Sequence, residues 1–343
     1  KVNGGSNNGV IRTLATGSIT TNLTDSNYIG VSTDDYADGA EATVQIAGIN
    51  ADQQGMTVGK QYILPDGSLT TDASSGGGGD YVVGTPVVFS PAVTGQATGT
   101  YDSASNKIVM AYPSSIGGGG SEGGTAIVGT VSGDTISFGP YAKYLNEYSR
   151  GNCVVYDPVA NKVVIVYMDA NGSKQGQAVV GTVSGDTITF GTPVVFATST
   201  PNELVATYSP AAKKFVIAYK DEGGPSNYGT AIVGEVVGDT ISFGAPATFN
   251  SRRTSSIAIV PHPTDNSVVI AYQDGGNSYY ATVLVGAIMG KDITFGTPVV
   301  FNSSGSMNYP TAVYDTEADK FVIAFAISGG KCSAYVGTVS GLT

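Results

Sequence analysis

The hydrophobic residues of this chain fall into short runs that are separated by turn-forming residues. In residues 152–196 the runs are NCVVYD, KVVIVYMD, QAVVGTV and TITFGTPVVF, with PVAN, ANGSKQG and SGD between them. Val, Ile, Thr, Tyr and Phe favour strands, whereas Gly, Asn, Asp and Pro favour turns. In the last run Ile188, Phe190, Val194 and Phe196 share one parity, which is typical of a half-buried strand, whereas KVVIVY is apolar on both faces. The pattern therefore predicts four strands, of which the second is buried between neighbouring sheets and the fourth lies outermost.

This four-strand pattern recurs along the chain. A Gly-Asp turn marker, or a variant of it, returns at intervals of 51 to 54 residues. A fixed period of this length is a mark of repeat architectures. The marker stands at Gly79-Asp80, Gly133-Asp134, Gly185-Asp186, Gly238-Asp239, Gly290-Lys291-Asp292 and, without the Asp, Gly341-Leu342. The spacing predicts five units.

Each unit is predicted to form one blade of a β-propeller, because a four-stranded antiparallel sheet buried on both faces by its neighbours is such a blade. The short S-G-D link predicts a hairpin within one blade, so the longer segment after the fourth strand crosses to the next blade. The fifth unit stops before its fourth strand, and GDYVVGTPVVF at 79–89 matches the missing strand. We therefore predict an all-β fold in which 79–343 form a five-bladed propeller whose last blade is completed by strand 80–89. This closure would cover exposed sheet edges, and the alternative is an open β-solenoid of stacked repeats.

Residues 1–78 do not fit the repeat and are predicted to form a separate, small β module that docks or oligomerises. GVIRTLATGSITT, EATVQIAG and KQYILPDGSLTT have strand-like patterns, and Pro65-Asp66-Gly67 is typical of a turn. Gly76 to Gly79 follow two serines and are typical of a flexible link.

Both parts resemble structural and tail-fibre-like virion proteins of marine bacteriophages, especially those that infect cyanobacteria. The resembling segments are the VGTVSGDTISFG units, YADGAEATVQI and GMTVGKQYILPDGSL at 55–69. Such proteins carry a G-L-T-x-G-x-x-Y-Y-V-x-x-D-G-x-L phrase, in which this chain has Met56 for Leu and Ile63 for the second Tyr. The resemblance covers most of the chain. It implies a non-enzymatic virion surface or fibre protein, with an extracellular location and with other virion proteins or copies of itself as partners.

Composition narrows the range of partners. With 27 acidic and 16 basic residues the net charge is −11, which disfavours binding to nucleic acid. No apolar run approaches the roughly 18 residues of a membrane span, so we expect a soluble chain without membrane insertion. The chain begins at Lys1 without Met, which fits a piece of a longer polypeptide.

Residues typical of catalysis or cofactor binding are scarce, and we predict no enzyme activity and no cofactor. His262 is the one histidine, and it lies in a predicted turn between two prolines. Asp102, Asp157 and Asp315 end the predicted innermost strands, with Ser209 and Pro261 in this place in the other units, and Asp is favoured there as a turn cap. An alternative is a polysaccharide-degrading propeller enzyme, which would need paired carboxylates near the axis. Calcium is conceivable at three acidic loops, and the weak candidates are Asp169, Asp221 and Asp274.

The loops predicted for one end of the blades differ in every unit. The crossings are PYAKYLNEYSRGN, ATSTPNEL, NSRRTSS and NSSGSMNYP, whereas the turns at the other end are short and nearly constant. Variable loops on a rigid scaffold are a common place for recognition, and Tyr and Arg suit it. The predicted ligand-binding residues are Tyr141, Tyr144, Tyr148, Arg150, Tyr228, Arg252, Arg253, Tyr279, Tyr280 and Tyr309. We expect this face to attach the virion to a host-surface glycan or protein, with a purely structural capsid-decoration or fibre subunit as the alternative.

Overall fold

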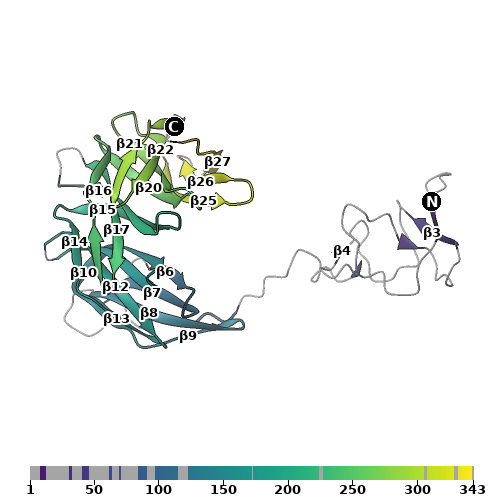
Figure 1. Cartoon of the computed structure of the whole chain (residues 1–343), viewed down its shortest axis with the longest axis horizontal. Helices are drawn as coiled ribbons and strands as arrows, with labels where there is room; N and C mark the ends of the chain where they lie inside the picture. The colour runs from purple at the N-terminus through teal and green to yellow at the C-terminus, as the bar shows by residue number, and fades with distance from the viewer. Residues whose placement is uncertain are drawn as a thin grey trace. The chain divides into compact units, whose positions relative to one another are not determined.

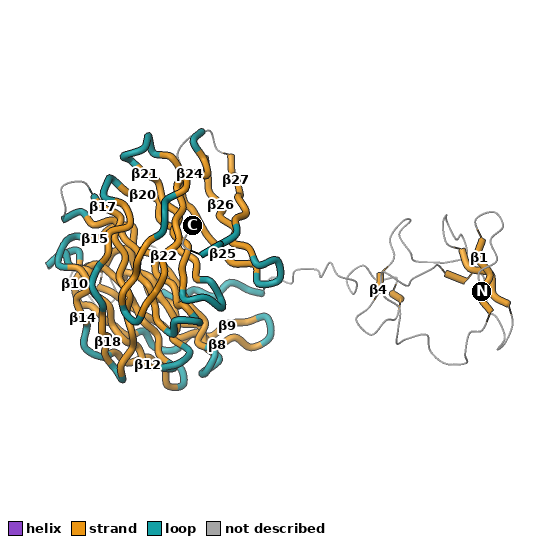
Figure 2. The backbone as a smooth tube through the Cα atoms, turned by 45° about the horizontal axis from the view of Figure 1, so that its top comes forward, coloured by secondary structure: helices purple, strands orange, loops and turns teal. Residues whose placement is uncertain are grey.

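The computed structural model describes most of the chain after residue 83 and five short strands before residue 71. Backbone and side chains are described for 84–90, 97–114, 123–171, 173–223, 227–304, 307–327 and 331–341. Every regular element in these residues is a β-strand (Figure 2). Within the described part of the chain, no helix has the length and apolarity needed to cross a bilayer. The predicted all-β class is confirmed.

The chain divides into two compact units, Lys1–Val83 and Gly84–Thr343. In the first, β3 (Glu41–Gln45) pairs with β1 (Asn8–Arg12) and β2 (Val31–Ser32), and β4 (Tyr62–Ile63) pairs with β5 (Leu69–Thr70). The three segments with strand-like patterns each contain a strand. The predicted turn Pro65-Asp66-Gly67 lies outside the described residues.

The described strands of the second unit fall into five consecutive antiparallel groups, which we call repeats 1 to 5. Repeat 1 contains β6 (Thr98–Asp102), β7 (Lys107–Ser114), β8 (Gly123–Ser132), β9 (Thr135–Phe138) and the first half of β10 (Ala142–Asp157). Repeat 2 contains the second half of β10, β11 (Lys162–Asp169), β12 (Gly176–Ser184), β13 (Thr187–Phe190) and β14 (Val194–Ala197). Repeat 3 contains β15 (Pro201–Ser209), β16 (Lys214–Asp221), β17 (Tyr228–Val237), β18 (Thr240–Phe243) and β19 (Ala247–Asn250). Repeat 4 contains β20 (Thr254–Pro261), β21 (Ser267–Asp274), β22 (Tyr280–Met289), β23 (Asp292–Phe295) and β24 (Val299–Asn302), and repeat 5 contains β25 (Asn308–Asp315), β26 (Lys320–Ile327) and β27 (Lys331–Gly337).

Two details of the strands differ from the prediction. The outermost strand is broken in two, so that β13 and β14 both pair with β12 on either side of the Gly191–Pro193 segment. The predicted crossing loop between repeats 1 and 2 is the continuous strand β10, which pairs with β8 and then, after a bulge, with β11. Repeats 1 and 2 therefore share one strand.

The repeats follow one another along an arc, from β6–β9 to the yellow strands β25–β27 (Figure 1). The inner strands β10, β15, β20 and β25 contact each other in order around the inside of this arc. Buried apolar residues form a cluster in each seam between neighbouring repeats, and one cluster joins Val164 and Val180 of repeat 2 to Phe215 and Ile241 of repeat 3. Sheets packed face to face about an axis form a β-propeller-type architecture.

An aromatic residue near the end of each outer strand closes the seam to the next repeat. Phe196 packs on Tyr219 and Phe243, with ring centroids 5.5 Å and 5.9 Å apart. Such pairs are worth about 0.5 to 1.5 kcal/mol beyond their buried area. The same pattern occurs for Tyr144 on Tyr167 and Phe190, for Phe249 on Tyr272 and Phe295, and for Phe89 on Tyr112 and Phe138.

A glycine in the break of the outer strand allows the hairpin turn of the next repeat to approach. A Cβ atom at Gly191 would overlap the carbonyl oxygen of Asp239, so no other residue fits there without a shift of the backbone. Gly139 and Gly244 meet the turns of the following repeats in the same way. The turn itself needs glycine for a different reason, because Gly185 has a φ of +58°.

The predicted closing strand 80–89 is described only from residue 84. Residues 84–90 form no ladder with any described strand, whereas the prediction placed them in the sheet of repeat 5. Instead they lie against repeat 1: Phe89 contacts Tyr112, and a Cβ atom at Gly84 would overlap the carbonyl oxygen of Asp134. These are the contacts that the end of an outer strand makes with the repeat that follows it.

Candidate functional site

The two ends of the repeats differ in kind. Antiparallel pairing places the links between first and second strands, and the Gly-Asp hairpins, at one end, which we call the constant-turn end. The links between second and third strands and the crossings between repeats lie at the opposite end, the variable-loop end.

At the constant-turn end the aspartates cap turns. Asp157 Oδ1 accepts hydrogen bonds from the backbone N–H groups of Val159 (2.9 Å) and Ala160 (3.0 Å). Asp102 and Asp315 accept the equivalent pairs, so the turn role predicted for these three carboxylates is confirmed.

His262, and not Pro261 as the sequence pattern predicts, takes this aspartate position in repeat 4. Its Nδ1 accepts from the N–H of Asp265 (3.1 Å) and of Thr264 (3.4 Å). Because Nδ1 is the acceptor, Nε2 carries the proton and donates to the Tyr314 hydroxyl at 2.9 Å, which in turn donates to Asp319 at 2.6 Å. The histidine is therefore a buried turn cap that links repeats 4 and 5.

The structure places the ten residues predicted for the variable-loop end in three different settings. Tyr141, Arg150, Arg252, Arg253, Tyr279 and Tyr309 are exposed. Tyr148, Tyr228 and Tyr280 are half-buried at strand ends. Tyr144 is buried.

Tyr144 is a correction to the predicted site. Only 7% of its surface is exposed, and its ring packs between Tyr167 and Phe190 in the seam of repeats 1 and 2. Its hydroxyl donates to Asn152 Oδ1 at 3.0 Å. The sequence predicts an irregular crossing at Tyr144. Instead β10 continues through this segment and places Tyr144 where Phe196 stands in repeat 2.

Two arginines and a tyrosine form a cluster at the seam of repeats 3 and 4. The Arg253 guanidinium carbon lies 5.9 Å from the centre of the Tyr279 ring, within cation–π range. Arg252 and Arg253 lie against Gly276 and Gly275, where any Cβ atom would collide with the arginine side chains. Tyr279 itself has a φ of +59°, so the loop that carries it is held in an uncommon conformation.

Exposed Arg150 and Tyr309 do not belong to this cluster and lie at bulges of the inner strands, which the sequence analysis did not predict. Each inner strand from repeat 2 onward carries a bulge near its start, and a residue with positive φ stands in it: Gly151, Glu203, Ser256 and Tyr309. Bulges re-aim side chains at functional rims and have no simple hydrophobic signature. Tyr309 is 92% exposed as a result.

The bulge of repeat 3 supports a charged network between repeats. Lys220 Nζ lies 2.9 Å from a Glu222 oxygen and 3.3 Å from a Glu203 oxygen, and Glu203 also accepts a hydrogen bond from the N–H of Ser256. Burial raises the pKa of Glu222, but the hydrogen bonds from Lys220 and Asn202 outweigh it, and its pKa lies below the ordinary value. This network fixes the backbone of the crossing instead of leaving a free carboxylate.

The three calcium candidates are not brought together. Asp221 and Asp274 accept backbone hydrogen bonds from Gly223 and Gly276 of their own loops, and Asp169 accepts one from Ser173. Within the described residues, no group of three or more His, Cys, Asp or Glu side chains could hold a metal ion.

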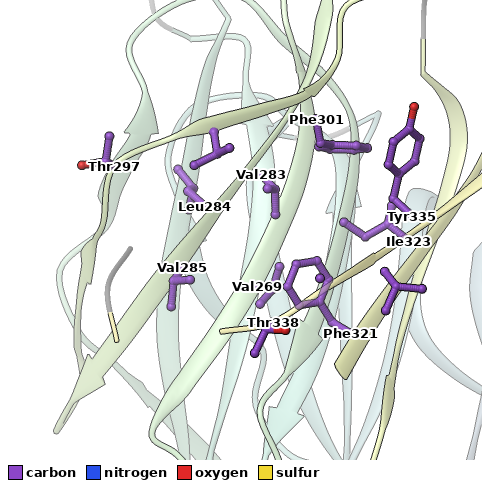
Figure 3. Close-up of a pocket in the computed structure, with 13 residues that line it drawn as sticks. Val269, Val283, Leu284, Val285, Thr297, Phe301, Phe321, Ile323, Tyr335 and Thr338 are labelled. Atoms are coloured by element: carbon purple, nitrogen blue, oxygen red, sulfur yellow. The ribbon is translucent and has the colours of Figure 1, made fainter. Parts of the chain in front are cut away.

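An apolar cavity of about 240 Å³ lies in the seam of repeats 4 and 5 (Figure 3). Phe301, Val283 and Leu284 line one side, and Ile323 and Tyr335 line the other. In the three preceding seams an isoleucine of the later outer strand is part of the packed cluster: Ile188, Ile241 and Ile293. Repeat 5 has no outer strand in the described residues, and the cavity lies where such a side chain packs elsewhere.

Comparisons with known proteins give likenesses in structure alone. No family model matches the chain, and no curated protein matches it. A solved protein of unknown function from Dyadobacter fermentans is 14% identical over 67% of this chain and 72% of its own, with a TM-score of 0.48. A triple-arginine mutant of AofleA from Arthrobotrys oligospora is 8% identical over 73% and 70% (TM-score 0.48), and the Dos1 propeller is 8% identical over 63% and 50% (TM-score 0.41). At such low identity and TM-score these likenesses carry no argument about ligand, activity or partners.

Proposed function

We propose that this chain is a non-enzymatic virion surface or fibre protein whose variable-loop end attaches to a glycan of the host surface. Attachment would be non-covalent, weak at each site and strengthened by the number of copies on the particle. The virion setting rests on the sequence resemblance to marine bacteriophage proteins, and the binding role rests on the geometry of the two ends.

The observation that carries the binding role is the contrast between these ends. At the constant-turn end, four of the five repeats with described turns use the same capped geometry or its histidine equivalent. At the variable-loop end, the same scaffold holds loops that differ in every repeat, and it holds exposed Arg252, Arg253 and Tyr279 in a defined arrangement. Fixed Arg and Tyr side chains on a rigid scaffold suit recognition of polar surfaces.

The test is binding of the full chain to a glycan array and to host cells, with Arg252, Arg253 and Tyr279 changed together to Ala. We expect saturable binding by the native chain and at least a tenfold loss in the triple variant, since about 1.4 kcal/mol corresponds to a tenfold change. The matched control is Lys213→Asn at the constant-turn end. It also removes a positive charge, and Asn already occupies this position in repeats 1 and 2, as Asn106 and Asn161 with the same positive φ.

Equal binding by the triple variant and the native chain would contradict the proposed face. Absence of binding by a folded native chain would favour the structural alternative. In that alternative, a capsid-decoration or fibre subunit, the separate unit Lys1–Val83 would dock on the particle or on another copy.

We further propose that 84–343 form a closed five-bladed propeller in which the segment that ends at Phe89 is the outer strand of repeat 5. Gly84 and Phe89 support this, because they contact repeat 1 as Gly191 and Phe196 contact repeat 3. In such a ring β27 would gain a partner at its exposed edge.

A further inference from the structure

A second cavity, of about 380 Å³, lies in the seam of repeats 2 and 3 at the variable-loop end. The crossing after β14 forms one wall, the end of β16 forms another, and β17 with β19 forms the third. Its volume is within the range of small-molecule sites. The polar side chains in its lining are Thr198, Ser199, Tyr219, Asp221, Thr230 and Thr248.

The cavity is open because of one small residue. Ala197 pairs with Gly176 at the start of the third strand, and Asn250 pairs with Gly229 at the same place in repeat 3. Asn250 fills its seam: its amide donates to Thr254 Oγ1 at 3.0 Å and to Asp274 Oδ1 at 3.3 Å. Leu145 and Asn302 hold this position in repeats 1 and 4, so Ala197 is the smallest of the four.

Because Ala197 does not fill the cavity, the carboxylate and hydroxyl groups of its lining are left open to a ligand. Asp221 stands where Asp274 stands in repeat 4, but it has no asparagine amide as a partner, and Pro201 replaces the hydroxyl of Thr254. One carboxylate oxygen of Asp221 accepts from the N–H of Gly223 at 3.0 Å. The carboxylate retains further acceptor capacity toward the cavity, because each oxygen has two lone pairs.

Tyr219 adds a phenol that stays protonated. Burial, followed by the charge of Asp221, raises the pKa of Tyr219 well above its usual range. Its hydroxyl can therefore donate and accept, as the Thr and Ser hydroxyls can. None of the described lining residues is Lys or Arg, so an anionic ligand would meet the charge of Asp221 without a compensating cation from them. A neutral ligand with several hydroxyl groups could instead donate hydrogen bonds to Asp221.

We propose that this seam cavity binds a neutral, hydroxyl-rich ligand, a monosaccharide unit, through Asp221 and the surrounding hydroxyl groups. The inference rests on the proposed function, since it names a pocket at the end that is proposed to attach to a host glycan. Under this proposal the sugar binds in the seam of repeats 2 and 3, beside Ala197, and not across the whole variable-loop end.

The test is ligand-observed NMR and calorimetry on the full chain with a panel of neutral monosaccharides, with a uronic acid and a hexosamine as charged probes. We expect saturable binding of at least one neutral sugar, with a dissociation constant on the order of millimolar for a ligand of this size. Ala197→Asn should weaken it at least about tenfold by refilling the cavity as Asn250 does. Because asparagine occupies this position in repeats 3 and 4, the variant is expected to keep its thermal midpoint.

Two further variants keep the inference testable. Asp221→Asn preserves the shape of the cavity and removes the charged acceptor, so it should also weaken sugar binding. Asn250→Ala opens the corresponding space in the next seam beside Asp274, and we expect a second, weaker site in titrations. Preference for the uronic acid or the hexosamine, or undiminished binding by both Ala197→Asn and Asp221→Asn, would overturn the proposal.

The outcomes separate this inference from the proposed function. If Ala197→Asn leaves glycan-array and cell binding unchanged, the pocket proposal is wrong and attachment stands. If free sugars bind in an Ala197-dependent way but no glycan or cell is bound, the pocket stands and attachment is wrong.

Discussion

At the scale of single residues, chemically different side chains cap the same backbone turn, the one that follows the inner strand of each repeat. The last position of the inner strand, or the one just after it, must present an acceptor to the turn, and Asp, Ser or His all supply one. His262 does more than its counterparts, because its second nitrogen reaches Tyr314 of the next repeat.

Changing His262 separates these two roles. We expect His262→Ala to lower the free energy of unfolding by about 1 to 2 kcal/mol, because it leaves turn N–H groups without their acceptor. His262→Asn should recover most of this loss, since the amide oxygen can cap the turn, although it does not reach Tyr314. Urea unfolding of the three proteins measures both effects, and equal stability of the Asn and Ala variants would show that capping is not what His262 contributes.

At the scale of strands, an ion pair crosses the seams between repeats. Lys162 Nζ lies 2.7 Å from Asp239 and donates to Thr182 at 2.7 Å, and Lys107, Thr130 and Asp186 repeat the arrangement one seam earlier. In the seam of repeats 3 and 4, two of the three positions differ. Glu235 stands where Thr182 stands in repeat 2 and pairs with Lys214, and Lys291 stands where Asp239 stands in repeat 3. The turn of each repeat is thus matched to the strand of the repeat before it.

The ion pair makes a pH-dependent contribution. The hydrogen bond from Lys162, and then its charge, hold the pKa of Asp239 below 3.8. A pKa that is lower in the folded chain stabilises the fold above the unfolded value, and this stabilisation is lost as the pH falls through the folded value. Asp239→Asn should therefore lower the urea midpoint at about pH 7 and have less effect at about pH 2.5. The effect will be small because Asp239 is 73% exposed, and Glu317→Gln, a carboxylate in a constant turn, serves as the control.

At the scale of the whole molecule, the proposed ring would close between repeats 5 and 1. Asp134 corresponds to Asp186 and Asp239, and in a closed ring the lysine facing it would be Lys320, with Thr338 beside it. In the described structure Lys320 Nζ instead reaches the carbonyl oxygen of Asp319 at 3.3 Å. Ring closure therefore predicts an ion pair that an open arc does not form.

A double-mutant cycle on Asp134 and Lys320 measures this pair directly. We expect a small coupling free energy with the sign of an attraction, similar in size to that of a parallel cycle on Asp239 and Lys162. Hydrogen exchange of β27 should then be as slow as that of β12, because both third strands would have an outer partner. If the Asp239–Lys162 cycle shows coupling but the Asp134–Lys320 cycle does not, and if the amides of β27 exchange fast, the ring is open.

The sequence by itself determined most of the strands, their order within each repeat and the short turns, because these depend on local features: alternation, β-branched residues, and glycine or asparagine where φ is positive. It also located the exposed Arg252, Arg253 and Tyr279. It did not determine that β10 continues through the first crossing or that the outer strand breaks in two. Only the tertiary structure decided that Tyr144 belongs to the core, that His262 replaces an aspartate, and that Ala197 leaves a cavity where Asn250 fills one. The placement of Tyr144 and the cavity beside Ala197 depend on side chains from a neighbouring repeat, about one period away in the sequence, because the packing of a seam is set by both of its walls. The His262 cap depends on the strand register of its own repeat, which places His262 opposite Ser267.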